Sequence, residues 1–74
     1  NSTITLNFGL SIADWVSITV YDIRGRKVDE LFEGMRSIGQ HTCIWNATAF
    51  VSGTYIVHLA TQKDVRVSKI MLLK

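Results

Sequence analysis

The sequence predicts a small all-β domain, an antiparallel β-sandwich of about six to seven strands. Over much of the chain apolar side chains alternate with polar ones, and this period of two is typical of strands with one buried face. Strand-like segments recur about every 10–12 residues with turn signals between them, which is typical of antiparallel sandwiches. No segment shows the apolar spacing of a helix.

The first half of the chain predicts three strands. Residues 3–10 alternate strictly, with every even position apolar, and residues 15–22 repeat the pattern. Residues 22–26 predict a turn, because Gly25 can take the positive φ that a reversal often needs. A third short strand is expected over 27–32, and its Val28 and Leu31 leave the register open.

The second half predicts three more strands, over 41–46, 53–60 and 65–74. A loop bracketed by two glycines is expected over 33–39, a connection around Phe50 and Val51 over 46–53, and a tight turn over 62–64. The alternating positions predict a core made of Ile4, Leu6, Phe8, Val16, Ile18, Val20, Cys43, Trp45, Tyr55, Val57 and Leu59.

The last predicted strand differs from the others, because its tail, Ile70-Met71-Leu72-Leu73, is apolar on both faces. Such a strand is either covered on both faces by the domain itself or meets another molecule. The sequence leaves both possibilities open.

Length and composition predict one domain over residues 1–74. The chain has 74 residues, 47% of them hydrophobic and 19% charged, which is enough apolar material for one compact core. It does not begin with Met, so we expect it to be a fragment of a longer protein. The net charge of +2 comes from scattered cations, which argues against nucleic acid as a partner.

Candidate chemistry is sparse, and we expect no enzyme activity, metal, cofactor or small-molecule substrate. Cys43 is the single cysteine, so it can form neither an internal disulfide nor a multi-Cys metal site. A carboxylate pair of Asp22 and Asp29 is conceivable, and His41 with Cys43 would share a strand face. We expect solvated turn acids in the first case and a strand-entry histidine beside a core thiol in the second.

Four aromatic side chains could in principle form a surface on which sugars stack. Trp45 and Tyr55 occupy core-facing positions, which leaves Trp15 and Tyr21 as the pair expected outside. A carbohydrate-binding or fibronectin-like accessory module of a secreted hydrolase therefore stays an alternative.

Four motifs in order resemble one known family. Residues 20–28 (VYDIRGRKV) resemble its VYDxxGRxV segment, and residues 39–47 (GQHTCIWNA) resemble GxHxVxWDA, with Cys43 for Val and Asn46 for Asp. Residues 52–59 (SGTYIVHL) resemble SGxYxxxL, and residues 69–74 (KIMLLK) resemble the closing KMxLLK. The family is that of the type A C-terminal sorting domains of the bacterial type IX secretion system.

The resemblance implies an Ig-like sandwich that is non-catalytic and sorts an upstream, covalently linked cargo. The cargo would pass from the periplasm through the outer-membrane secretion machinery and be secreted or held at the cell surface. Export information is expected in the last strand, where the candidate recognition residues are Lys69, Ile70, Met71, Leu72, Leu73 and Lys74. The Ig-like domain of the flagellar hook-capping protein shares two of the motifs, so a structural role of that type is a second alternative.

Overall fold

A computed structural model describes residues 2–74 of the chain, and this part consists of strands and connections without a helix. The strands are β1 (Thr3–Leu10), β2 (Asp14–Asp22), β3 (Lys27–Arg36), β4 (Gly39–Asn46), β5 (Gly53–Ala60) and β6 (Val65–Leu72). All neighbouring strands are antiparallel.

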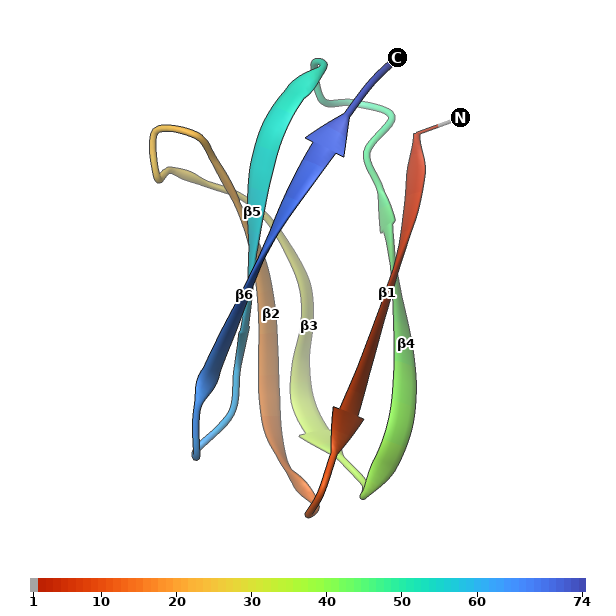
Figure 1. The fold of residues 1–74 in the computed structure, drawn as a ribbon, viewed down its shortest axis with the longest axis vertical. Helices are drawn as coiled ribbons and strands as arrows, with labels where there is room; N and C mark the ends of the chain where they lie inside the picture. Colours follow the sequence, from red (N-terminus) through yellow and green to blue (C-terminus); the bar gives the residue numbers. More distant parts are fainter. Residues whose placement is uncertain (1) are drawn as a thin grey trace.

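The strands form two sheets that pack face to face (Figure 1). One sheet contains β1 and β4, and the other has the order β3-β2-β5-β6. The turn between β2 and β3, the loop between β4 and β5 and the C-terminus lie at one end of the sandwich. The predicted fold class, a small antiparallel Ig-like sandwich, is confirmed.

The core lies between the sheets and is built from the inward positions of the alternating strands. Val16, Ile18 and Val20 of β2 and Trp45 of β4 are at most 1% exposed. Of the expected core residues, only Ile4, Leu6 and Cys43 are half-buried rather than buried. The core also contains three residues that were not expected in it, Leu10, Ala47 and Leu72.

The predicted end of the third strand at residue 32, with a loop over 33–39, is wrong. β3 continues to Arg36, where it pairs with Asp14. The register between β2 and β3 shifts twice, between Ile18 and Thr19 and again between Val20 and Tyr21. Both irregularities lie within residues 27–32 and break the alternation there, so Val28 and Leu31 fit no regular pattern. The missed extension pairs regularly but contains Glu33 and Gly34, residue types that are depleted in strands.

The turn between β2 and β3 is organised by Asp22. Its Oδ1 accepts hydrogen bonds from the backbone N of Arg24 and of Arg26, both at 2.9 Å, and its Oδ2 accepts one from Arg26 Nε at 3.0 Å. Gly25 has a φ of 83°, a conformation that side chains other than glycine rarely adopt. The predicted turn over 22–26 is therefore confirmed, and hydrogen bonds between Asp22 and Arg26 join its two ends.

The last strand ends at Leu72 rather than at Lys74. The possibility that the domain itself covers both faces of this strand is wrong. Ile70 and Leu72 face the core, whereas Val65, Val67 and Met71 are 59–62% exposed. The strand lies at the edge of its sheet and pairs only with β5 among the described strands.

Candidate functional site

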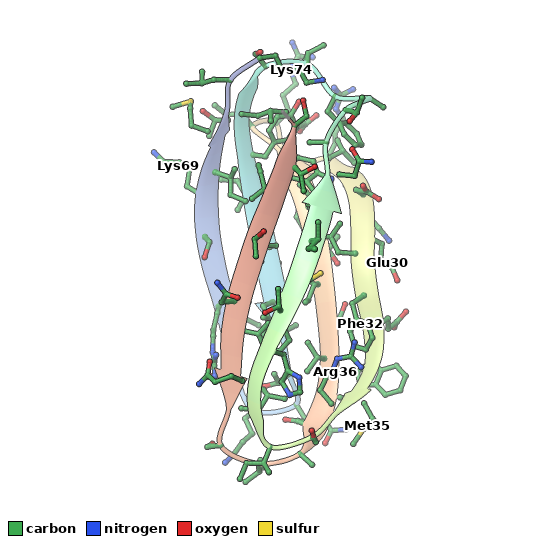
Figure 2. The ribbon with its side chains drawn as sticks, turned by 90° about the vertical axis from the view of Figure 1, so that its right-hand side faces the viewer. Glu30, Phe32, Met35, Arg36, Lys69 and Lys74 are labelled. Atoms are coloured by element: carbon green, nitrogen blue, oxygen red, sulfur yellow. The ribbon has the colours of Figure 1, made fainter. Side chains whose placement is uncertain are left out.

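The six candidate recognition residues divide between the core and solvent. Leu72 is 3% exposed and Ile70 is half-buried, so these two residues attach the end of β6 to the sandwich. Met71 and Leu73 are 62% and 75% exposed, and Lys69 points away from the sheet (Figure 2). The segment therefore presents Lys69, Met71, Leu73 and Lys74 to solvent, while Ile70 and Leu72 anchor it.

Lys74 lies against the loop between β4 and β5. Its Nζ donates a hydrogen bond to the carbonyl oxygen of Thr48 at 2.6 Å, and its backbone N donates one to Ser52 Oγ at 3.1 Å. The loop is itself ordered, because Asn46 Oδ1 accepts hydrogen bonds from the backbone N and the hydroxyl of Thr48. The final lysine thus has a defined position although it is exposed.

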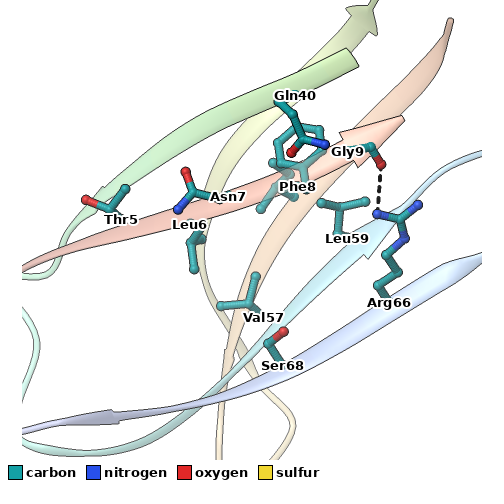
Figure 3. Close-up of a pocket in the computed structure, with 11 residues that line it drawn as sticks. Thr5, Leu6, Asn7, Phe8, Gly9, Gln40, Val57, Leu59, Arg66 and Ser68 are labelled. Atoms are coloured by element: carbon teal, nitrogen blue, oxygen red, sulfur yellow. Dashed lines mark hydrogen bonds between the residues drawn. The ribbon is translucent and has the colours of Figure 1, made fainter. Parts of the chain in front are cut away.

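An open groove of about 420 Å³ lies between β1 and the β5–β6 hairpin. Its floor is apolar, with Leu6, Phe8, Val57 and Leu59 among the lining side chains (Figure 3). Arg66 crosses one end of the groove, where its Nη1 donates a hydrogen bond to Gly9 O at 2.9 Å. The groove contains no acid, thiol or histidine that could act as a general base or nucleophile.

The two carboxylates considered as a pair have separate structural partners. Asp22 holds the turn between β2 and β3, and the backbone N–H of Arg26 is the main reason that its pKa lies below the ordinary value. Asp29 Oδ2 accepts a hydrogen bond from Trp45 Nε1 at 3.0 Å, and its Oδ1 accepts one from the backbone N of Glu30. These contacts explain both acids without a role in catalysis.

His41 and Cys43 lie on the same face of β4, as predicted, but the contacts of the His41 ring are with other residues. His41 Nε2 is 2.7 Å from Ser37 O, and its ring packs 5.4 Å from that of Phe8. Burial raises the pKa of the Cys43 thiol, against a smaller opposing effect of Arg36. A thiol with a raised pKa is a poor nucleophile at neutral pH.

The expected outward aromatic pair is separated along β2. Tyr21 packs against His58 with ring centroids 4.6 Å apart, whereas Trp15 is the cross-strand neighbour of Met35 at the other end of the strand. Trp45 and Tyr55 are buried, as expected. Nothing in this arrangement favours the carbohydrate-binding alternative.

Residues 2–74 contain neither a candidate metal site nor a membrane-spanning helix. No group of three or more His, Cys, Asp or Glu side chains is placed to hold a metal ion. No helix in this part of the chain could cross a membrane.

Two exposed residues at the C-terminal end of the sandwich were missed by the sequence analysis. Ile23 in the turn between β2 and β3 is 76% exposed, and Val51 in the loop between β4 and β5 is 77% exposed. Both line a shallow hollow of about 210 Å³. The signal that could have revealed them is a large β-branched apolar residue within a turn, where small and polar residues are the rule.

Comparison with known proteins identifies the family. The family model described as a secretion system C-terminal sorting domain matches residues 1–73. No curated protein and no solved structure matches the chain. The match supports a sorting role in type IX secretion and implies a secreted or cell-surface cargo, and domains of this kind are in general non-catalytic. The chain therefore belongs to the family of secretion system C-terminal sorting domains.

Proposed function

We propose that this chain is a non-catalytic sorting signal at the C-terminal end of a longer secreted protein. It directs a covalently linked upstream cargo from the periplasm across the outer membrane through the type IX secretion machinery. The family match over residues 1–73 carries the proposal. The exposed side chains of the final segment support it, because a signal must be accessible to the machinery that reads it.

The recognition residues of this proposal are Lys69, Ile70, Met71, Leu72, Leu73 and Lys74. Within this segment the exposed side chains alternate with Ile70 and Leu72, which the sandwich holds in place. The exposed apolar side chains of Met71 and Leu73 contribute little to folding and are available for contact with another protein. Lys74 adds a cation that can form charge-assisted hydrogen bonds.

The first test removes Leu73 and Lys74 from a fluorescent reporter fused to this domain, expressed in a host with the secretion machinery. The truncation ends at Leu72, so the core keeps its last buried residue. The lost contacts of Lys74 are exposed hydrogen bonds, which contribute about 1 kcal/mol or less each. We expect a melting temperature near that of the intact domain and a reporter that stays in the periplasm.

A longer truncation that also removes Met71 and Leu72 is the control for loss of folding. It deletes a core residue, so we expect it to lower the melting temperature and export together. Normal export of the folded two-residue truncation would contradict recognition at this end of the chain. An intact domain that leaves the reporter in the periplasm would contradict the sorting function itself.

A further inference from the structure

The end of the sandwich that carries Lys74 presents the three most exposed large apolar side chains of the described residues. Ile23, Val51 and Leu73 are 75–77% exposed, more than any other large apolar residue in the described chain. They come from three segments far apart in sequence, which meet at the same end of the molecule (Figure 1). Ile23 and Val51 line one hollow, and Ser52, next to Val51, is bonded to the backbone N of Lys74.

The same end has an excess of positive charge. Arg24, Arg26 and Lys74 lie there, and Asp22 is the acid in the turn between β2 and β3. Asp22 is occupied within the turn, where its carboxylate binds Arg26 and two backbone N–H groups. No described residue pairs with the guanidinium of Arg24, which leaves that cation available for a partner of opposite charge.

The turn that holds Ile23 and the loop that holds Val51 are both fixed by hydrogen bonds. In the turn, Asp22 N donates to Arg26 O at 2.9 Å and Gly25 N donates to Asp22 O at 3.0 Å. In the loop, the hydroxyl of Tyr55 donates to Val51 O at 2.6 Å. A surface that is already ordered loses little entropy on binding, so these contacts prepare the end for recognition.

The loop has a second support from aromatic packing. Phe50 packs against both Trp45 and Tyr55, with ring centroids 5.5 Å and 6.3 Å away, and its backbone N donates to Ala47 O. Phe50 is therefore turned into the sandwich while its neighbour Val51 is turned out. The contacts of Asn46, Thr48 and Phe50 show that these residues stabilise the loop, whereas the exposed side chain of Val51 has no such role.

We propose that this end is one composite recognition surface, in which Ile23 and Arg24 of the turn and Val51 of the loop act together with Leu73 and Lys74. The partner it fits is a receptor protein with an apolar depression rimmed by carboxylates. The proposal rests on the sorting function and extends the recognition site beyond the final strand. It assigns to the turn and the loop a role that their contribution to folding does not require.

The test uses the same reporter fusion with two variants at this end, the double variant Ile23→Ser/Val51→Ser and the charge reversal Arg24→Glu. All three side chains are exposed, so we expect the melting temperature to change by no more than a few degrees. Export should fall by about tenfold or more, as expected when residues central to an interface are lost. Arg24→Lys keeps the charge and should retain most of the export.

Matched controls lie at the opposite end of the sandwich. Ile38→Ser removes an apolar side chain that is 66% exposed, in the turn between β3 and β4. Lys63→Glu makes the same change of charge as Arg24→Glu, in the turn between β5 and β6. Both controls should be exported like the unchanged domain.

The outcomes separate this proposal from the sorting function. If the unchanged domain is exported and the folded variants Ile23→Ser/Val51→Ser and Arg24→Glu are exported normally as well, the composite surface is overturned. The sorting function then stays intact. An equal loss in the controls would also overturn the composite surface. Failure of the unchanged domain to be exported would contradict the sorting function, and the composite surface would fall with it.

Two other occupants of the surface are tested with purified domain. In the first test, the domain is sedimented with vesicles of phosphatidylethanolamine and phosphatidylglycerol. Co-sedimentation that is lost in Arg24→Glu would identify a lipid surface, instead of a protein, as the partner. A dimer in size-exclusion chromatography that is lost in Ile23→Ser/Val51→Ser would identify a second copy of the chain. Either result would overturn the proposal of an acidic protein receptor.

Discussion

At the scale of the single residue, Trp45 joins the two sheets. Its side chain is 0% exposed, and its ring lies 5.5 Å from Phe50 and 5.3 Å from Tyr55. The indole Nε1 donates to Asp29 on β3, the strand at the edge of the other sheet. One residue of β4 therefore contacts the core, the loop between β4 and β5, and β3.

Trp45→Ala should destabilise the domain by about 3–5 kcal/mol, because it removes a large buried ring and leaves Asp29 without its indole donor. A domain of this size has a total stability of only about 4–11 kcal/mol, so a large fraction is lost. Urea unfolding measures the effect. Trp15→Ala is the matched control, since Trp15 is 43% exposed, and it should have a much smaller effect. Equal effects of the two substitutions would show that the inward face has been assigned wrongly.

Most single core residues could be predicted from the sequence, and the exceptions have physical reasons. Alternation identifies Phe8, Ile18 and Val57, because polar neighbours mark the outward face of their strands. Leu72 could not be found in this way, because its neighbours Met71 and Leu73 are apolar and exposed. Ala47 is buried at the start of a loop, a position to which no period applies.

At the scale of the element, β6 is an open sheet edge. It is a regular strand whose pairing with β5 continues without a register shift from Val65 to Leu72. Its outward side chains Val65, Val67 and Met71 are exposed and apolar, and Lys69 is the charged residue among them. A lysine in the middle of an edge strand disfavours pairing with other chains.

Lys69→Val should therefore increase self-association of the purified domain. The substitution creates a continuous apolar outer face on an edge strand of high β-propensity. Light scattering after size-exclusion chromatography, repeated over a range of concentrations, measures the effect. Lys63→Val removes the same charge in the adjacent turn and should leave the domain monomeric. A monomeric Lys69→Val variant would show that the edge is protected by other means.

The strands differ in how well the sequence predicts them. β1 and β5 have the predicted bounds, because an uninterrupted alternation defines both ends. β3 is longer than predicted, because its last part includes Glu33 and Gly34, residue types that are depleted in strands, although it pairs regularly with β2. The exposed outer face of β6 could not be decided from sequence, since an apolar run is compatible with both burial and binding.

At the scale of the whole molecule, two exposed charged pairs make the stability of the domain depend modestly on pH. Arg26 is the main cause of the lowered pKa of Asp22, and Lys27, bonded to Glu30 at 2.7 Å, is the main cause of the lowered pKa of Glu30. The same contact raises the pKa of Lys27, and burial raises that of Cys43. The first two shifts stabilise the domain above the ordinary carboxyl range, and their contribution is lost as the pH falls through the lowered values.

The other two shifts act at the alkaline end, because raised pKa values contribute stability that is lost as the pH rises through them. We expect the melting temperature to be nearly constant between about pH 5 and pH 8 and to fall modestly on either side, since the charged pairs are exposed. Asp22→Asn should reduce the fall in melting temperature below about pH 5, because the substituted side chain cannot titrate. If the melting temperature of this variant falls below about pH 5 as much as that of the unchanged domain, Asp22 does not contribute to the pH dependence of stability.

The candidate site could be predicted only in part. The final segment was identified from its apolar run and its resemblance to the family, and the structure explains which of its side chains are accessible. Ile23, Arg24 and Val51 could not be placed beside it, because they lie in two connections whose position depends on the pairing of β2 with β5. Proximity between loops depends on the complete fold rather than on any local pattern.

The pairing of β1 with β4 also has a consequence for the rate of folding. β2–β3 and β5–β6 are hairpins that close locally, but Thr3 must find Asn46 across two intervening strands. Closing such a long loop is entropically costly before its contacts form, and domains rich in distant pairings fold in milliseconds to seconds. The pairing of β2 with β5 is equally distant, since Ser17 pairs with Ala60. A newly made chain therefore passes through a period in which the two hairpins can form while both long-range pairings are still open. During this period Trp45 is uncovered and the domain is most vulnerable to proteases and to pairing with other chains.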